Sequence, residues 1–444
     1  MAGSILYDQS DLAYRMGTGV ATYARNLATA AQNAGFGIEE LVSTEAKVDA
    51  ANPLLAEAQL FDVQRKPLHP WADNVLGVMR APFGYRPRPL PHAGAVLHES
   101  MRVAFDRTYV GTRLFNVARP HFFVHGRFTR VSLPTAPSLF HATFPLPIRV
   151  AGCPNIVTIH DLVPLRLPYM TLDNKRYFFR LVQRHLAEAD HIVTVSEFSR
   201  QDIITLFDVP ESRITNAYQG VALPPRLLAQ TNDQVADQIT NQFELDPGNY
   251  YLFLGALEPK KNVGRLIDAY AASGSRRPLV IAGGQGWQNE RELERINDTR
   301  FSNYRVTENI ISNVKRVRRI SYLPLGQLVT LMRGARALLF PSLYEGFGLP
   351  VLEAMTLGTP VMTSNVTSLP EVAGDAALLV DPRDISAMAA AIRQLDNDTD
   401  LLGELSVRGR IQAAKFSMAN YQARLQDLYS NVLGVNHATL GRGP

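Results

Sequence analysis

Two carboxylates, Glu345 and Glu353, stand eight residues apart on either side of a turn that contains two glycines. An apolar run at 335–340 precedes them and predicts a buried strand. Pro350 suits the first turn of a helix, and Gly358 suits its end. The segment therefore predicts a strand, a glycine loop and a helix N-terminus, an arrangement that binds anions through backbone N–H groups.

The two acids also limit what this site can hold. A carboxylate beside a phosphate repels it, so Glu345 and Glu353 are better suited to accept hydrogen bonds from neutral hydroxyls, such as those of a sugar or a ribose. The alternative is an ordinary crossover with a tight turn and a solvated glutamate. The coincidence of the glycines, the helix signals and both acids favours a binding site.

A second strand and glycine segment carries positive charge. The apolar run 250–254 ends at Gly255, and Lys260, Lys261 and Asn262 follow before a helical pattern. Asn262 is expected to cap that helix. Paired lysines are usually solvated, but two of them at the exit of an apolar strand favour contact with phosphate.

Two further segments end or begin at polar or glycine residues. The apolar run 155–159 leads into His160 and Asp161, and the carboxyl end of a buried parallel strand is where ligands bind. A core histidine satisfied by its neighbour is the alternative. Gly17 and Gly19 precede a helical pattern, but the third glycine of a dinucleotide fingerprint is missing, so an ordinary turn explains them equally well.

The order of these patterns predicts the fold class. A chain of 444 residues is too long for one common core, and strands alternate with helices throughout. We predict an α/β protein with two doubly wound parallel sheets facing each other across a cleft. The expected domains are 1–222 and 223–418, followed by a C-terminal helix and tail, 419–444, that could cross back to the first domain. A linker is expected near 222–245, and 369–374 is read as a turn.

The segment from about 65 to 135 is predicted to be the least regular part of the first domain, because prolines break it repeatedly. Between Arg65 and Arg130 it carries eleven lysines and arginines against three acids, although the whole chain has a net charge of only +4. Apolar side chains among these cations favour an anionic membrane surface or a lipid-phosphate acceptor. An insertion with a solvated basic face is the alternative.

Cysteine usage and hydropathy give an expected location. The only cysteine, Cys153, rules out a disulfide within the chain and fits a reducing compartment. No signal peptide is apparent, and no apolar stretch approaches the roughly 20 residues needed to cross a bilayer. We expect a cytoplasmic protein that is at most peripheral on the inner face of the plasma membrane.

Three motifs together resemble the GT-B retaining glycosyltransferases of family 4. They are Glu345-Gly-Phe-Gly-Leu-Pro-x-x-Glu353, Gly255-x-x-Glu258-Pro-x-Lys261-Asn262 and Val157-Thr-Ile-His160-Asp161. The resemblance covers most of the chain and is weakest from 45 to 135. The second and third motifs further resemble bacterial mannosyltransferases of surface polysaccharide, exopolysaccharide and lipopolysaccharide assembly. A GT-B fold is implied, with an acceptor-side first domain and a second domain that binds the nucleotide sugar.

The resemblance implies a role for each charged residue. Glu345 would lie beside the donor sugar ring, His160 near the reacting carbon and Lys261 on the diphosphate, so these three are the expected catalytic residues. Glu353 would hold the ribose hydroxyls. Many relatives carry an arginine where Ala256 stands; Lys260 could substitute for it, since a point charge can also neutralise phosphate.

Backbone contacts to the donor are implied as well. Gly17 and Gly19 would approach the diphosphate from the first domain. The backbone at Tyr322 and Leu323 would read the base. The backbone amides of Phe347, Gly348 and Leu349 would cradle the sugar and diphosphate.

The implied reaction is retaining transfer of mannose from GDP-mannose to a polyprenyl-linked or oligosaccharide acceptor. Without an Asp-x-Asp element at a strand end, neither a metal nor another cofactor is expected. Another donor, such as UDP-glucose, is the alternative within the enzyme class. The alternatives outside it are a non-catalytic relative and a nucleic-acid-binding protein, and the latter lacks any recognised binding module and leaves Glu345 and Glu353 unexplained.

Overall fold

The computed structural model describes residues 3–9, 19–45, 48, 52–60, 79, 81–91, 104–287, 290–298, 301–307 and 310–434; the side chains at 291, 302–307 and 310–314 are not described. Gly17 therefore lies outside the described residues. The same holds for four cations of the basic segment, Arg65, Lys66, Arg80 and Arg102.

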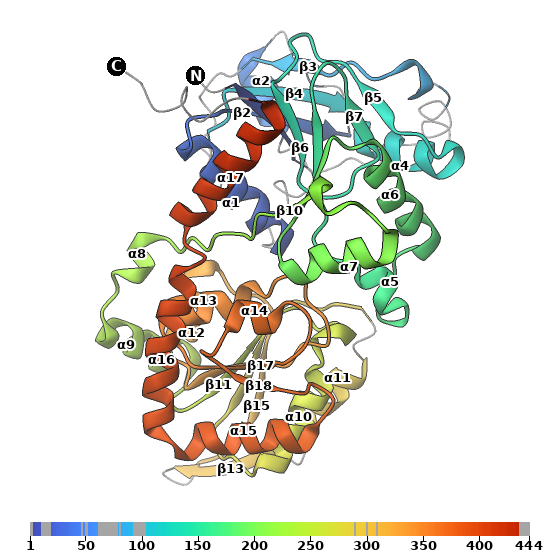
Figure 1. The fold of residues 1–444 in the computed structure, drawn as a ribbon. Helices are drawn as coiled ribbons and strands as arrows, with labels where there is room; N and C mark the ends of the chain where they lie inside the picture. The colour runs from blue at the N-terminus through green and yellow to red at the C-terminus, as the bar shows by residue number, and fades with distance from the viewer. Residues whose placement is uncertain are drawn as a thin grey trace.

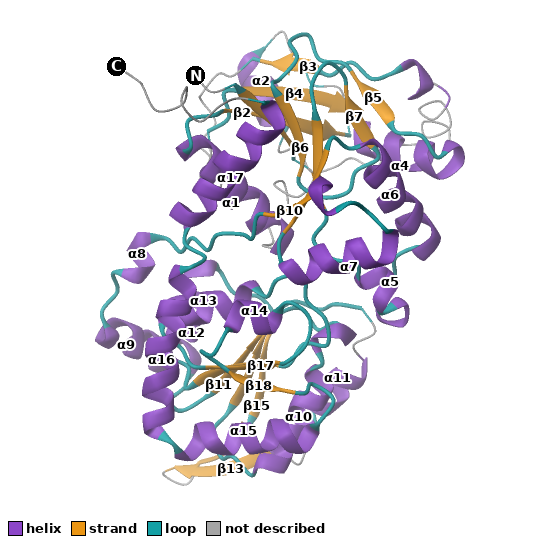
Figure 2. Cartoon of the chain, in the orientation of Figure 1, coloured by secondary structure: helices purple, strands orange, loops and turns teal. Residues whose placement is uncertain are grey.

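A sheet of eight strands forms the centre of the N-terminal half, which we take as the chain up to the end of β10 (Figures 1 and 2). In sheet order its strands are β10 (Ile214–Asn216), β9 (His191–Thr194), β8 (Asn155–Thr158), β6 (Leu139–Ala142), β1 (Ser4–Asp8), β2 (Gly37–Thr44), β4 (Arg107–Thr112) and β3 (Arg88–Leu90). All neighbours are parallel except β3 with β4. The predicted parallel sheet is confirmed, with one antiparallel strand at its edge.

A second, six-stranded parallel sheet forms the centre of the C-terminal half. In sheet order its strands are β15 (Val317–Ile320), β12 (Leu279–Ala282), β11 (Tyr251–Leu254), β16 (Ala337–Phe340), β17 (Val361–Ser364) and β18 (Leu378–Val380). Two small ladders lie outside the main sheets: parallel β5 (Thr129–Val131) with β7 (Ile148–Val150), and antiparallel β13 (Ser302–Thr307) with β14 (Ile310–Lys315).

Helices alternate with these strands along the chain. In the N-terminal half they are α1 (Gly19–Asn33), α2 (Pro53–Gln59), η1 (Ala81–Phe83), α4 (Leu114–His125), α5 (Val163–Arg166), η2 (Pro168–Met170), α6 (Lys175–Glu188), α7 (Glu197–Phe207) and η3 (Glu211–Arg213). After β10 they are α8 (Pro225–Leu228), α9 (Asn232–Phe243), η4 (Pro259–Lys261), α10 (Val263–Ser273), α11 (Glu290–Ile296), α12 (Leu325–Gly334), α13 (Leu349–Leu357), α14 (Leu369–Ala373), α15 (Ile385–Asn397), α16 (Thr399–Ala414) and α17 (Met418–Leu433).

The strand orders give the switch point of each sheet, where successive strands begin to be added on the opposite side. In the first sheet the chain moves outward on one side from β1 to β2 and on the other from β6 to β8, so the switch point lies between β1 and β6. In the second sheet it lies between β11 and β16. Ligands of doubly wound sheets bind at the carboxyl ends of strands at such points, because the crossovers diverge there. β11 and β16 are the strands that lead into the lysine segment and the Glu345 segment.

Two local expectations were wrong. The expected linker at 222–245 contains α9, whose first turn is closed by a capping box between Thr231 and Gln234 and whose Val235 and Ile239 are buried. This helix packs against α12, so the segment belongs to the C-terminal half. The expected turn at 369–374 is the short helix α14, which buries Leu369 and Val372. The capping box is a local signal that the linker reading overlooked, whereas α14 has only five residues and no side-chain cap, so burial must stabilise it.

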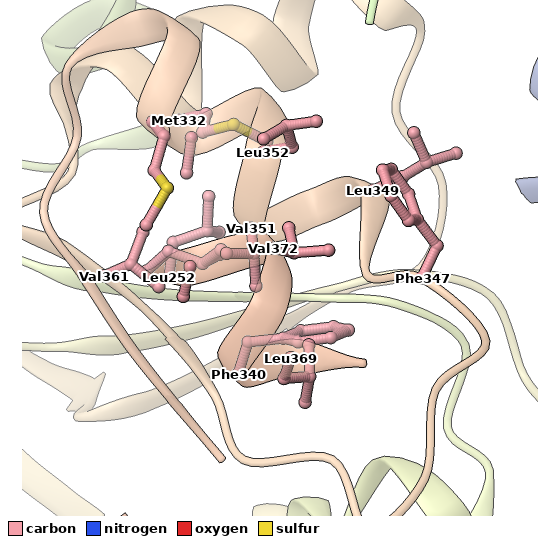
Figure 3. Close-up of a cluster of buried hydrophobic side chains, with 14 of the residues drawn as sticks. Leu252, Met332, Phe340, Phe347, Leu349, Val351, Leu352, Val361, Leu369 and Val372 are labelled. Carbon is pink, nitrogen blue, oxygen red and sulfur yellow. The ribbon is translucent and has the colours of Figure 1, made fainter. Parts of the chain in front are cut away.

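The hydrophobic core of the C-terminal half lies around α13 (Figure 3). Val351 and Leu352 of this helix are buried together with Leu252 of β11, Phe340 of β16 and Val361 of β17. Since these side chains come from three adjacent strands, α13 is held over the middle of the sheet, at its switch point. The core thus fixes the helix that carries Glu353.

The last helix, α17, returns to the N-terminal half and lies beside α1 (Figure 1). Its Tyr429 shares a hydrogen bond with Tyr7 of β1 (3.0 Å between the hydroxyl oxygens) and another with Nδ1 of His141 of β6 (2.8 Å). This is the path expected for the C-terminal segment; the domain limits at 222/223 and 418/419 stay predictions.

Candidate active site

The loop between β16 and α13, which we call the glycine loop (341–348), turns sharply into the helix. Gly348 has a φ of 106°, a conformation that residues with a side chain rarely adopt. The helix then begins at Leu349, with Pro350 in its first turn, and Gly358 closes its last turn. The predicted strand, glycine loop and helix N-terminus are therefore present.

Residues after β17 hold the glycine loop in place. The Ser368 hydroxyl lies 3.0 Å from the carbonyl oxygen of Glu345 and 2.9 Å from that of Phe347, and can donate to either. The backbone N–H of Glu345 donates to Oγ1 of Thr367 (3.3 Å). Ser368 is fully buried. The loop is thus fixed at its backbone before any ligand binds.

The glycine loop and the lysine segment meet in an ion pair. Nζ of Lys261 donates to Oε1 of Glu345 over 2.7 Å, and the two side chains are only 14% and 10% exposed. Burial alone would raise the pKa of Glu345, but the charges of Lys261 and Lys260 outweigh it and hold the pKa below its ordinary value. Glu345 is therefore ionised at neutral pH, beside a cation of η4, the short helix that follows β11.

Lys260 lies among acids from both halves of the protein. Burial would lower its pKa, but the carboxylates of Asp161, Glu345 and Glu258 outweigh this and raise it. Lys260 therefore stays charged in the site, as its expected role on a diphosphate requires. Ala256, the position of the missing arginine, is partly exposed at the exit of β11.

The prediction that Asn262 caps α10 was wrong. Its backbone is left-handed, with a φ of 61°, and its side chain makes no cap hydrogen bond. The side-chain amide instead donates to the carbonyls of Pro341 (3.0 Å) and Pro382 (2.7 Å), which follow β16 and β18. Asn262 thus joins three loops at the carboxyl edge of the sheet.

Glu353 is the fifth residue of α13 and is partly buried. Burial raises its pKa from 4.5 to about 7, because its charged form loses hydration. A carboxylate in this condition gains from any hydroxyl that donates to it. Tyr322 and Leu323 follow β15 at the same edge; Tyr322 is 60% exposed, and Leu323 packs partly against the core.

His160 follows β8 in the N-terminal half. Its Nε2 lies 2.8 Å from the carbonyl oxygen of Thr143, and because a carbonyl only accepts, Nε2 carries the proton. Burial lowers the pKa of His160, so the imidazole is neutral. Tyr23 of α1 packs edge-on against it, with ring centroids 4.7 Å apart. Gly19, the first residue of α1, lies about one turn before Tyr23.

The two halves meet at His160 and the glycine loop. A Cβ on Gly346 would lie 2.5 Å from the His160 carbonyl oxygen, so this contact requires glycine. Ser199 Oγ donates to the same carbonyl (2.8 Å). The structure therefore brings His160 close to the Glu345–Lys261 pair, and places Lys260, Phe347, Gly348, Leu349 and Glu353 on the segments around that pair.

Several residues that complete this arrangement were missed from the sequence. Thr367 and Ser368 support the glycine loop, and Glu371 of α14 contacts α7 of the opposite half. Tyr344 donates to Asp202 of α7 (2.7 Å), which also accepts from Arg166. Their partners are far away in the chain, so the only local signal was the Ser and Thr pair before Leu369.

Comparison with known proteins gives the family. A family model described as Glycosyltransferase Family 4 matches residues 17–223, and one described as Glycosyl transferases group 1 matches residues 236–412. The chain is 34% identical over 299 residues to O-antigen chain mannosyltransferase B of Escherichia coli, covering 66% of this chain and 74% of that protein. The chain belongs to glycosyltransferase family 4.

Other relatives of this glycosyltransferase match less of their own length. It is 30% identical over 271 residues to the serotype-specific mannosyltransferase WbdA of Escherichia coli, covering 60% of this chain but only 32% of that protein. With the O-antigen chain mannosyltransferase RfbU of Salmonella typhimurium the identity is 26% over 250 residues, covering 56% of this chain and 63% of RfbU.

Solved structures confirm the predicted GT-B fold of the glycosyltransferase. The sucrose-phosphate synthase of Thermosynechococcus elongatus superposes with a TM-score of 0.64 at 18% identity, covering 97% of this chain and 99% of that one. HepE of Anabaena superposes with a TM-score of 0.62 at 14% identity, covering 97% of this chain and all of that one. Both matches cover nearly the whole of this chain.

Neither a membrane-spanning helix nor a metal-binding cluster is present among the residues that the structure describes. Among the helices that the structure describes, none is long and apolar enough to span a membrane. Within the same residues, no group of three or more His, Cys, Asp or Glu side chains is arranged to hold a metal ion.

Proposed function

We propose that this glycosyltransferase is an α-mannosyltransferase, which moves mannose from GDP-mannose, with retention of configuration, to an oligosaccharide or polyprenyl-linked acceptor in surface polysaccharide assembly. The observation that carries the proposal is the 34% identity with the O-antigen chain mannosyltransferase B of Escherichia coli. WbdA and RfbU are also named mannosyltransferases, which supports the same sugar.

The residues around the Glu345–Lys261 pair support this reaction. As the bond from the sugar to the diphosphate breaks, its electron pair leaves with the phosphate oxygen and the sugar ring gains positive charge. The acceptor hydroxyl oxygen bonds to the ring carbon, and its proton passes to the departing phosphate oxygen. Lys261, Lys260 and the N-terminus of α13 would stabilise the leaving diphosphate. Glu345 would face the cationic ring, and His160 would contact the sugar from the opposite half.

The remaining site residues would hold the nucleotide. Glu353 would accept hydrogen bonds from the ribose hydroxyls, which relieves the unfavourable burial of its charge. The backbone at Tyr322 and Leu323 would read the base, and the amides of Phe347, Gly348 and Leu349 would cradle the sugar and diphosphate. Gly19 would approach the diphosphate from α1, together with Gly17.

A UDP-sugar is the second candidate donor, because structures of HepE hold UDP, glucose or UDP-glucose in the same fold. We expect GDP-mannose to raise the melting temperature most in a panel of GDP- and UDP-sugars, since a ligand that binds only the folded state stabilises it. Donor hydrolysis across the same panel, with and without a chelator, checks that binding reflects turnover. Stabilisation by UDP-sugars alone would overturn the mannose proposal.

We also propose a peripheral contact with anionic lipid on the inner face of the plasma membrane. Phe83 of η1 is 90% exposed, and Phe123 and Val124 at the end of α4 are 58% and 63% exposed. η1 contacts α4, and Arg119 and Arg127 beside these residues are exposed as well. Not all cations of the segment contribute, because Arg107 and Arg113 pair with Glu39 and Glu45.

A double variant of Phe123 and Val124 to serine is expected to lose flotation with anionic vesicles, because it removes apolar side chains that would enter the lipid surface. The matched control is a Val407→Ser, Ile411→Ser variant, whose residues are 57% and 64% exposed on α16 of the other half. Equal flotation of both variants would contradict the membrane proposal. Binding to nucleic acid, which the basic segment alone would allow, is not expected.

A further inference from the structure

Glu371 crosses from the C-terminal half to a helix of the N-terminal half. Its Oε2 accepts a hydrogen bond from the backbone N–H of Glu197, and its Oε1 accepts one from that of Phe198, each over 3.0 Å. These are the first two residues of α7, whose N–H groups have no partner within the helix. Figure 1 shows α14, which carries Glu371, beside α7 between the two sheets. The Tyr218 hydroxyl adds a third contact to Oε2 (3.3 Å).

The first turn of α7 is in turn connected to His160. Ser196 caps the helix by accepting from the backbone N–H of Ser199 (3.0 Å), and the two hydroxyls lie 2.9 Å apart. The Ser199 hydroxyl donates to the His160 carbonyl (2.8 Å), and both serines are fully buried. A displacement of this turn would therefore displace His160.

The segment that carries Glu371 also holds the other side of the site. Thr367 and Ser368, four and three residues earlier, bind the backbone of Glu345 and Phe347. One short segment, 367–371, thus contacts both the glycine loop and the helix that supports His160. Its geometry sets the position of His160 relative to Glu345.

A separate contact would keep α7 close to the glycine loop if Glu371 were changed. Tyr344, the residue before Glu345, donates to Asp202 in the second turn of α7, and Asp202 also accepts from Arg166. Replacement of Glu371 alone should then leave the halves associated while the first turn of α7 loses its anchor.

From these contacts we propose that Glu371 is a positioning residue for glycosyl transfer: through the first turn of α7 and Ser199 it aligns His160 with Glu345. This inference rests on the roles proposed above for His160 and Glu345. Glu371 does not touch the reacting groups, so its removal should slow the chemical step and leave donor binding, most of whose contacts the C-terminal half would provide, nearly unchanged.

The test compares Glu371→Gln with Asp384→Asn. Asp384 is the matched control because its carboxylate also caps a helix, accepting from Ala387 N–H of α15 (2.9 Å), but within one half. We expect Glu371→Gln to lower kcat roughly ten- to one hundred-fold, the loss of one charge-assisted hydrogen bond, with donor KM changed less than about three-fold. Asp384→Asn should leave kcat unchanged and alter the melting temperature little, because Asp384 is exposed and asparagine also caps helices. Glu371→Asp, which keeps a shorter carboxylate, should lose less kcat than Glu371→Gln. If Glu371→Gln does not fold, Glu371→Asp takes its place in the test.

A double-variant cycle separates positioning from a general loss of stability. Ser199→Ala removes the same connection at its other end, so Glu371→Gln and Ser199→Ala together should lower kcat no further than the stronger of the two alone. If the two single-variant losses in kcat multiply in the double variant, or if Glu371→Gln has the wild-type kcat, the inference is overturned.

Amide hydrogen exchange gives a readout that does not depend on transfer. Glu371→Gln should speed exchange at 196–199 and around His160, and Asp384→Asn should not. If the unchanged protein hydrolyses no nucleotide sugar, the proposed function fails, whereas the exchange result still reports on the Glu371 contact. Unchanged exchange at both segments in Glu371→Gln would overturn the inference independently of activity.

Discussion

Replacing Lys261 by methionine is expected to lower kcat roughly 100- to 1000-fold, because a fixed donor to a developing anion contributes about that much in a site shielded from water. The same change should lower the free energy of unfolding by about 3 kcal/mol, the lower end for breaking a buried ion pair, since Lys260 remains beside Glu345. Methionine keeps the stem of the lysine, whose Nζ lies 4.9 Å from the centroid of the Phe340 ring. Urea unfolding and donor turnover measure the two effects.

The control for this prediction removes both charges. A Lys261→Met, Glu345→Gln variant lacks the whole ion pair, and Lys260 keeps Asp161 and Glu258, so we expect most of the lost stability to return while turnover stays low. This result would show that the Glu345–Lys261 pair affects the free energy of unfolding and the turnover number independently. A kcat within ten-fold of the unchanged protein in Lys261→Met would show that Lys260 alone neutralises the leaving group, and would contradict the role proposed for Lys261.

Glu353→Gln is expected to make the protein without ligand more stable above pH 7 and to weaken donor binding. The pKa of Glu353 is raised from 4.5 to about 7 by burial, so between these pH values the unfolded chain releases a proton that the folded chain retains. The wild type therefore loses stability as pH rises through this window, and glutamine, which cannot ionise, does not. We expect a gain of about 1–3 kcal/mol at pH 8 that is absent at pH 4.

Donor affinity should change in the opposite direction, falling roughly ten- to one hundred-fold, because a charged acceptor for the ribose hydroxyls is replaced by a neutral one. Glu404→Gln is the matched control: Glu404 is an exposed carboxylate paired with Arg408 along one helix, and its loss should change neither quantity by much. A Glu353→Gln protein that binds the donor as before would contradict the ribose role, and one whose stability shows the same pH dependence as the wild type would contradict the burial of its charge.

Much of the fold and part of the site could be predicted because the signals are local. Each apolar run that ends in a polar or glycine residue marks a strand and its carboxyl end, and parallel strands bring these ends to one edge. Glu345 and Lys261 could therefore be assigned to one edge from their places after the neighbouring strands β16 and β11, and His160 to the carboxyl edge of the other sheet. The glycine loop and both ends of α13 were likewise visible in the spacing of glycines and prolines.

What could not be predicted depends on contacts between segments far apart in the chain. Glu371 looked like part of a turn, because its acceptor role exists only when α7, more than 170 residues earlier, lies against it. Asn262 had the residue type of a helix cap, but its NH2 group donates to two proline carbonyls from other loops, and its Oδ1 accepts from Arg265 instead of a backbone N–H. Tertiary contacts that override a local preference leave no pattern in the nearby sequence.

The return of α17 to the N-terminal half has a consequence for synthesis of the chain. The hydroxyl partner of Tyr7, which is also part of its cover, is Tyr429, and Tyr429 is translated 422 residues later. At about 5–20 residues per second, the face of the first sheet that α17 covers stays open for tens of seconds after translation of Tyr7. The C-terminal half can bury its own core during that time. It can therefore complete its folding before the N-terminal half, although it is translated later.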